Sequence, residues 1–372
     1  MAGDKIQRPE LGRTHGSRRM RSWLRAGLVV PEIVAIVPAH NEQDCVAQTI
    51  TSLLTQTVPP TTIVVVADNC TDRTVEIARE FPVVVMETVD NAHRKSGALN
   101  QAWALHGRDA DVVFTMDADT VLRPDSIEQL VASMLADRSS AAVCARYWAR
   151  DAKGLAQRLQ RLEYARYDDN REIRGWRIQV ASGAAAMYRG EVLRRLPRVR
   201  AGRGPWDETS LIEDYGLTLD LKSQGYRVRA SNGAHVITDT PKTFGELWTQ
   251  RQRWGRGGVD ECRKRGWVWG TRRDIAAYVL FAFGMLMRLV FIAYVALILA
   301  LGLSMTLSLL GLVPLAIMWF DRVASAWRVP GRDWRDMAIV LPMLIEDFYG
   351  LFLEACTAVA VVRSLRGADQ NW

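Results

Sequence analysis

The sequence predicts an α/β fold in which a mostly parallel sheet, covered by helices on both faces, is followed by apolar helices. Three observations lead to this prediction. Short apolar runs alternate with helical patterns between residues 33 and 116. These runs are apolar at almost every position, which is typical of strands buried on both faces. After residue 275 the composition changes abruptly, and the stretch 275–320 contains a single charged residue, Arg288.

The elements of the predicted sheet alternate along the chain. The strands are Ile33–Val37, Ile63–Val66, Val83–Met86 and Val112–Met116, and the helices between them are Asp44–Leu54, Asp72–Glu80 and Gly97–Leu105. Residues 120–240 continue as mixed α and β structure, and residues 243–258 form a short amphipathic helix. Open α/β sheets bind ligands at the carboxyl ends of their strands. Polar residues that directly follow these strands are therefore the first candidates for a site.

Residues 1–30 form a basic arm, which carries seven lysines and arginines against two acids in a chain of net charge +7. Such an arm suits nucleic acid or anionic lipid, and a solvated tail is an equally good reading. It is no signal peptide, because Arg21 and Arg25 interrupt its apolar stretch. We therefore expect the following domain, residues 31–260, in the cytosol. The five scattered cysteines indicate neither a zinc site nor a disulfide framework, as expected in a reducing compartment.

The membrane region is predicted over residues 261–372. Two spans, at about 275–298 and 300–320, are joined by a tight turn, and a buried hairpin in a soluble domain is the alternative. Four arginines in the linker 321–336 place that linker on the cytosolic side. The apolar segment 338–362 carries three acids, Glu346, Asp347 and Glu354. It is either a third span whose acids face an interface near Arg288, or a helix along the cytosolic face.

The strongest chemical signal is Asp117-Ala118-Asp119, which directly follows a predicted strand. Two carboxylates at a strand end can share one divalent cation, and hard oxygen ligands suit Mg²⁺ or Mn²⁺. Asp109-Ala110-Asp111 has the same spacing but lies before the strand, and we interpret it as a surface turn.

Three further motifs follow strands or open helices. Pro38-Ala39-His40-Asn41-Glu42 ends the first strand, and Asp68 ends the second. A carboxylate such as Asp68 can accept the imide N–H of uracil, although capping of the next helix is the plain alternative. Lys95 precedes a predicted helix, and helix N-termini favour phosphate, although a lone lysine is more often only solvated.

Taken in order, these motifs resemble the inverting glycosyltransferases of family 2, which have the GT-A fold. Three later segments extend the resemblance to about residue 260: Ser182-Gly183-Ala184-Ala185, Glu213-Asp214 and Gln250-Arg251-Gln252-Arg253-Trp254. The last is similar to the family's Gln-x-x-Arg-Trp motif. Two positions depart from the pattern, because Ile212 replaces the Thr of Thr-Glu-Asp and Ala67 replaces the first Asp of an Asp-Asp pair.

The resemblance implies a role for each matching residue. Asp214 is the expected general base, and Asp117 and Asp119 are the expected metal ligands. The donor is expected to contact Pro38, Ala39, Asn41, Glu42, Asp68, Lys95, Asp117 and Arg253. The acceptor is expected to contact Ser182, Gly183, Glu213, Gln250 and Trp254. For Trp254 the alternative is a tryptophan at the membrane interface.

The function implied is the transfer of a sugar from a nucleotide-sugar, preferably a UDP-sugar, to a glycan or lipid acceptor. The enzyme is expected in the plasma membrane as a multi-pass protein with a cytosolic catalytic domain, and no nucleic acid partner is expected. The alternatives are transfer to a protein acceptor and a non-catalytic membrane scaffold on the same fold. The sequence leaves the sugar, the linkage and the oligomeric state open.

Overall fold

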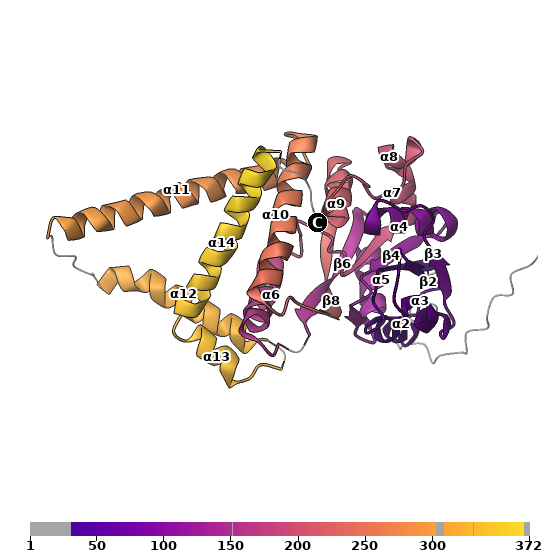
Figure 1. The fold of residues 1–372 in the computed structure, drawn as a ribbon, viewed down its shortest axis with the longest axis horizontal. Helices are drawn as coiled ribbons and strands as arrows, with labels where there is room; N and C mark the ends of the chain where they lie inside the picture. Colours follow the sequence, from indigo (N-terminus) through magenta and orange to yellow (C-terminus); the bar gives the residue numbers. More distant parts are fainter. Residues whose placement is uncertain (1–30, 151, 303–308, 330, 368–372) are drawn as a thin grey trace, which may run out of the picture. The chain divides into compact units, whose positions relative to one another are not determined.

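The computed structural model of the chain describes residues 31–150, 152–302, 309–329 and 331–367 (Figure 1). The predicted basic arm, residues 1–30, lies outside this part. The chain divides into two compact units, which we call the sheet unit and the helical unit. Among the described residues, the sheet unit comprises 31–150, Arg174–Leu221 and Tyr226–Asp239. The helical unit comprises 152–173, Lys222–Gly225 and the described residues from Thr240 onward.

The sheet unit is built on an eight-stranded sheet in the order β3-β2-β1-β4-β7-β6-β8-β5. Its first half is parallel, as predicted, and consists of β1 (Ile33–Ala39), β2 (Thr62–Ala67), β3 (Val84–Glu87) and β4 (Val112–Met116). The second half is mixed. It consists of β5 (Val121–Leu122), β6 (Ser140–Ala149), β7 (Ala185–Arg189) and β8 (Arg227–Thr238), with β7 antiparallel to both β4 and β6.

Helices cover both faces of this sheet, which confirms the predicted layer arrangement (Figure 1). They are α2 (Val46–Leu54), α3 (Thr74–Arg79), α4 (Arg94–Ala102), α5 (Ser126–Ala136), α7 (Gly190–Arg195), α8 (Pro197–Arg200) and α9 (Glu213–Ser223), with a π-helical turn at Trp103–Gly107. Side chains of β1 alternate between two hydrophobic clusters. Val37 packs in the cluster that contains α2 and α5, and Ile36 packs in the cluster that contains α4 and α9. This alternation is the period of two expected for a strand with both faces buried.

The helical unit contains α6 (Leu155–Ile173), α10 (Phe244–Arg265), α11 (Arg272–Ala300), α12 (Leu309–Trp327), α13 (Trp334–Val340) and α14 (Leu344–Leu365). The predicted amphipathic helix 243–258 is confirmed as α10, and the predicted span 275–298 is confirmed as a helix within α11. The predicted span 300–320 coincides with α12 only in part, because residues 303–308 lie outside the described part. By length and composition, α11 and α14 are the two described helices that can cross a membrane.

The charged helix α10 lies alongside α14 over most of its length (Figure 1). The side chain of Gln252 donates to the backbone oxygen of Cys356 at 2.6 Å. Near the other end, Ser364 donates to Asp260 and accepts from Arg263. The apolar helix α14 thus packs against a helix rich in charge, and the choice between a third span and a surface helix stays a prediction.

Each of the three acids of α14 has an arginine partner. Glu346 binds Arg166 at 2.5 Å, Asp347 binds Arg322 at 2.6 Å, and Glu354 binds Arg288. The last pair is the contact with Arg288 that the sequence suggested for this segment.

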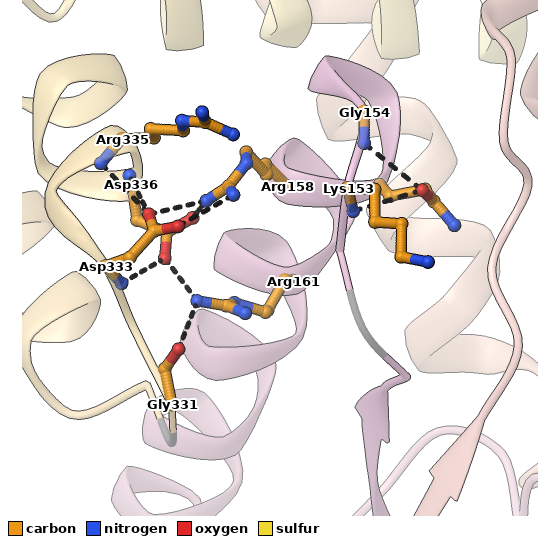
Figure 2. A network of polar contacts seen from close by, with 9 residues as sticks. Lys153, Gly154, Arg158, Arg161, Gly331, Asp333, Arg335 and Asp336 are labelled. Atoms are coloured by element: carbon orange, nitrogen blue, oxygen red, sulfur yellow. Dashed lines mark hydrogen bonds and ion pairs between the residues drawn. The ribbon is translucent and has the colours of Figure 1, made fainter.

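A second ionic network fixes α13 on α6 (Figure 2). The Arg158 guanidinium binds both carboxylate oxygens of Asp333, at 2.6 and 2.8 Å, and Oδ1 of Asp336 at 2.9 Å. Arg161 also binds Asp336, whose side chain is fully buried. Asp333 and Asp336 form a capping box at the start of α13. The network therefore caps the start of α13 and pairs the guanidinium groups of Arg158 and Arg161 with carboxylates.

Candidate active site

The predicted motifs meet at one edge of the sheet unit, because β1 is paired in parallel with both β2 and β4. The segments after these three strands carry Asn41, Asp68 and Asp117. Parallel pairing brings their carboxyl ends to the same side, as the sequence predicted.

The loops after β1 and β2 are held together by hydrogen bonds. Asn41 and Asn69 adopt left-handed backbone conformations, with φ of 56° and 49°, which asparagine tolerates better than most residues. The side-chain oxygen of Asn41 accepts from the backbone N–H of Thr71 at 2.8 Å. The backbone N–H of Glu42 donates to the hydroxyl of Thr74 at 2.7 Å. The two motifs are therefore joined by hydrogen bonds into one surface at the carboxyl ends of β1 and β2, which we call the ledge. Pro38 and Ala39, at the end of β1, are part of it.

Asp68 is buried in this ledge and is not a helix cap. Its Oδ1 accepts hydrogen bonds from the side chains of Asn69 at 3.0 Å, Thr88 at 3.0 Å and Asn91 at 2.7 Å. In the described part of the chain all three of these bonds use Oδ1, so Oδ2 is available to a ligand. Thr88 and Asn91 were not predicted, because they lie between elements and belong to no motif.

Four acids gather near the end of β4: Glu42, Asp117, Asp119 and Asp239. Burial, reinforced by the charges of Asp119 and Asp117, raises the pKa of Glu42 to about 7. Burial and the charge of Asp117 raise the pKa of Asp119 to about 6. This excess of negative charge in a partly buried place favours a cation.

The donor chemistry of Asp117 and Asp119 fits a hard divalent ion that completes its coordination with ligand oxygens. No group of three or more His, Cys, Asp or Glu residues in the described part of the chain forms a metal cage of its own.

Lys95 lies in the first turn of α4, because this helix begins at Arg94 and not at Gly97 as predicted. The side chain of Asn91 accepts from the backbone N–H of His93 at 3.0 Å, and this turn leads directly into the helix. The Lys95 ammonium binds Oδ1 of Asp117 at 2.5 Å and Oε1 of Glu213 at 2.7 Å. It therefore joins the acids after β4 to the acids at the start of α9.

Asp214 is held by two backbone N–H groups. That of Gly183 donates to Oδ2 at 2.9 Å, and that of Tyr215 donates to Oδ1 at 2.7 Å. Burial and the neighbouring Glu213 raise the pKa of Asp214 to about 6, although Lys95 opposes the rise. A partly buried carboxylate with a pKa in this range has the properties of a general base.

Gly183 is required by this arrangement. A Cβ atom on this residue would lie 2.6 Å from Nζ of Lys95, and 3.6 Å from carboxylate oxygens of both Asp214 and Glu213. The segment Ser182–Gly183 therefore passes directly over the lysine that links the two groups of acids.

Residues 34–196 match the sequence profile of the family described as Glycosyl transferase family 2. This chain carries a family 2 glycosyltransferase domain. Asp214 and the α10 motif lie beyond the matched residues.

Relatives of known name agree with this family. The chain is 28% identical over 253 residues to a probable glycosyltransferase, YdaM, of Bacillus subtilis, in a match that covers 64% of this chain and 58% of that protein. It is 24% identical over 258 residues to a poly-beta-1,6-N-acetyl-D-glucosamine synthase of Staphylococcus epidermidis, covering 68% of this chain and 60% of that one. The chain therefore spans less than two thirds of the length of these curated relatives.

Among solved structures, the mannosyltransferase PcManGT from Pyrobaculum calidifontis, in complex with GDP-Man and Mn²⁺, has a TM-score of 0.59 to this chain. The two are 19% identical, and the match covers 94% of each. This similarity shows that the fold is GT-A.

One hydrogen-bonded link of the family 2 domain was not predicted. The side chain of Asn100, in α4, donates to the backbone oxygen of Trp206 at 2.9 Å and accepts from its N–H at 3.0 Å. It also donates to Glu208 at 3.1 Å. Asn100 thus fixes the loop that leads into Glu213 and Asp214. Asn100 lies in the helix predicted over Gly97–Leu105, but that helical pattern gives no signal for this contact.

The remaining predicted residues, Gln250, Arg253 and Trp254, lie on α10 of the helical unit. Arg253 is exposed, Trp254 is 37% exposed, and Oε1 of Gln250 is buried without a partner among the described residues. Their spacing puts them on one helix face, as predicted. Their roles in donor and acceptor binding stay predictions.

Proposed function

We propose that this chain is a metal-dependent inverting glycosyltransferase. It moves a sugar from a nucleotide-sugar, preferably a UDP-sugar, to a hydroxyl group of a glycan or lipid at the cytosolic face of the plasma membrane. The observation that carries the proposal is Asp214, a partly buried carboxylate of raised pKa. It lies beside the Lys95 ammonium, which reaches the Asp-x-Asp motif.

The donor is bound along the ledge at the ends of β1, β2 and β4. Oδ2 of Asp68 accepts the imide N–H of the base, because Oδ1 is already used by three protein donors. Asp117 and Asp119 hold Mg²⁺ or Mn²⁺, which when bound supplies positive charge to the diphosphate leaving group. The excess of acids near β4 supports this assignment. So does the solved complex of the mannosyltransferase with GDP-Man and Mn²⁺.

Asp214 prepares the nucleophile. Its free carboxylate accepts the proton of the acceptor hydroxyl as that oxygen forms a bond to C1 of the sugar. The bond between C1 and the diphosphate oxygen breaks in the same step, and the diphosphate leaves with the electron pair. A single displacement of this kind inverts the configuration at C1. The backbone N–H groups of Gly183 and Tyr215 keep the carboxylate oriented.

A sugar hydroxyl is the preferred acceptor, and Trp254 provides an exposed aromatic face on which a sugar ring can stack. The N-acetylglucosamine polymer synthase among the relatives supports a glycan acceptor. A protein acceptor remains the alternative within the class. The scaffold alternative is disfavoured, because a degenerate site would not retain Asp117, Asp214 and Lys95 between them.

Membrane attachment is assigned to α11, whose most apolar 18-residue window has no residue buried within the protein. In the multi-pass arrangement that we propose, α11 and α12 enter the membrane. The helix α14 packs against α10 and binds Arg288 of α11 through Glu354. Exposed tryptophans next to the apolar helices, such as Trp269 and Trp327, support an interfacial position for these ends.

The proposal is tested with the full chain purified in detergent. Nucleotide release is measured from UDP-N-acetylglucosamine, UDP-glucose and GDP-mannose, with Mn²⁺ or Mg²⁺, with and without a membrane lipid extract or N-acetylglucosamine oligosaccharides. We expect release from one donor, loss of release in EDTA, and recovery on adding Mn²⁺. Equal release in EDTA would contradict the role of the metal, and absence of release from every donor would favour the scaffold alternative.

A further inference from the structure

The Gln-x-x-Arg-Trp motif contains a second arginine, Arg251, to which the sequence assigns no role. Arg251 follows Gln250 on α10, and its side chain is only 10% exposed. Its guanidinium carbon lies 4.7 Å from the centre of the Trp254 ring, three residues further along the same helix. An arginine at this distance from an indole stabilises the ring by a cation–π interaction.

Arg251 is itself held from the opposite side. Its Nη2 donates to Oε2 of Glu163, on α6, at 2.9 Å, and the Glu163 side chain is 9% exposed. The same oxygen accepts from the hydroxyl of Tyr349, on α14, at 2.6 Å, and Oε1 accepts from Tyr167 at 2.8 Å. Burial in this cluster lowers the pKa of Arg251, but the Glu163 carboxylate and the neighbouring tyrosines outweigh this effect and raise the pKa above its usual range.

The cluster therefore forms a chain of contacts from α14 to the exposed indole. Tyr349 and Tyr167 orient Glu163, Glu163 orients Arg251, and Arg251 lies against Trp254. All of these residues belong to the helical unit. The Arg251 guanidinium thus makes two contacts at once: an ion pair with Glu163 and a cation–π contact with the Trp254 indole.

We propose that Arg251 is a positioning residue that fixes the Trp254 indole for the acceptor sugar, and that Glu163 and Tyr349 hold Arg251 in place. The inference rests on the proposed role of Trp254 in acceptor binding. It adds that the docking of α14 on α6 and α10 fixes the position of the Trp254 indole within the helical unit.

A spectroscopic test needs no acceptor. The full chain is labelled with 5-fluorotryptophan, and the fluorine resonance of Trp254 is assigned by its loss in Trp254→Phe. We expect this resonance to shift and sharpen in Arg251→Ala and to recover in part in Arg251→Lys, which keeps the ion pair but lacks the planar guanidinium. An unchanged resonance in Arg251→Ala would overturn the proposal.

The control is Arg166→Ala, which breaks the ion pair of the same α6 helix with Glu346 on α14. This pair is comparably buried and does not involve Trp254. The proposal requires the Trp254 resonance to keep its position in this variant. A shift of equal size in both variants would mean that Arg251 acts only through general stability.

Kinetics then separate this inference from the proposed function. In transfer to N-acetylglucosamine oligosaccharides, or to the lipid extract if only that is used, Arg251→Ala should raise the acceptor KM about tenfold and leave the donor KM unchanged. The double variant Arg251→Ala/Trp254→Ala should match Trp254→Ala alone. Additive effects would overturn the positioning role. A wild-type acceptor KM in Trp254→Ala would instead contradict the proposed function of Trp254.

Discussion

Gly183→Ala is the substitution that best tests the geometry of the candidate site. The added methyl group would lie 2.6 Å from Nζ of Lys95, which real carbon atoms do not tolerate. The ammonium must therefore move by about 1 Å, since ordinary contacts of this kind are near 3.5 Å. Such a move breaks or lengthens its 2.5 Å contact with Asp117 and its 2.7 Å contact with Glu213.

The size of the effect follows from these two contacts. A hydrogen bond to a charged group contributes about 1.5–3 kcal/mol, so loss of one such contact lowers kcat/KM by about 10- to 100-fold. The move also takes the Lys95 ammonium away from Asp214, and the charge of this ammonium opposes the rise in the Asp214 pKa. The acidic limb of the pH profile should therefore move to higher pH. Because the displaced atom is the end of a flexible side chain, the free energy of unfolding should change by less than about 1 kcal/mol.

The assay is nucleotide release, measured as kcat/KM from pH 5 to pH 9, beside thermal unfolding of the same preparation. Gly154→Ala is the matched control, because the nearest atom to its added Cβ is a backbone oxygen at 3.7 Å. The control should behave as the wild type in both measurements. If Gly183→Ala keeps the wild-type kcat/KM and acidic limb, the bridging role of Lys95 is wrong.

Three other predictions follow from named contacts. In the wild type, kcat/KM should fall as the pH drops through about 6, because the folded-state pKa of Asp214 is raised to about 6 and the base is protonated below it; a profile flat down to pH 5 would contradict this assignment. Asp336→Ala should destabilise the helical unit by about 3–5 kcal/mol in a denaturant titration, because it removes the fully buried carboxylate partner of Arg161 and one of the two carboxylate partners of Arg158. Asp347→Ala, at a half-exposed pair, should cost at most about 1 kcal/mol, and equal losses in the two variants would refute the argument. Asn91→Ala removes a 2.7 Å hydrogen bond to Asp68 and should raise the donor KM about three- to tenfold with little change in kcat; an unchanged donor KM would separate Asp68 from donor binding.

The parallel half of the sheet could be predicted because its strands are apolar and local in sequence. Val37 and Val112 lie in runs whose burial on both faces leaves a simple pattern. The mixed half could not be ordered in this way. Its strands pair with partners that are distant in the sequence, β6 in parallel with β8 and β7 antiparallel to β4. The hydrophobic pattern of a strand does not identify such a partner.

Candidate site residues that belong to a sequence motif could be predicted. Contacts that depend on tertiary structure could not. Asp117 and Asp119 form an Asp-x-Asp motif directly after a strand, whereas Asp214 was proposed only because Glu213-Asp214 resembles a family motif. Lys95 was expected at phosphate alone, whereas its long side chain binds two acids from distant segments. Asn91 and Asn100 act through single side-chain hydrogen bonds to loops, for which no periodicity gives a signal.

The membrane segment 338–362 shows why composition alone left two alternatives open. Its three acids indicated a polar environment, but the sequence does not show which residues the acids bind. Glu346 binds an arginine of α6, and Glu354 binds Arg288 of the apolar helix α11. Pairing with charged α10 on one side and apolar α11 on the other is a property of tertiary packing.

The central claim is that Asp214 is the base of a single displacement, and Asp214→Asn tests it most directly. The amide keeps the size of the side chain and can still accept one backbone hydrogen bond, but it cannot take a proton. Nucleotide release at pH 8 with saturating donor and Mn²⁺ should fall by about 10²- to 10⁴-fold, while donor binding measured by calorimetry stays within about threefold of the wild type. Release within tenfold of the wild-type rate would contradict the account.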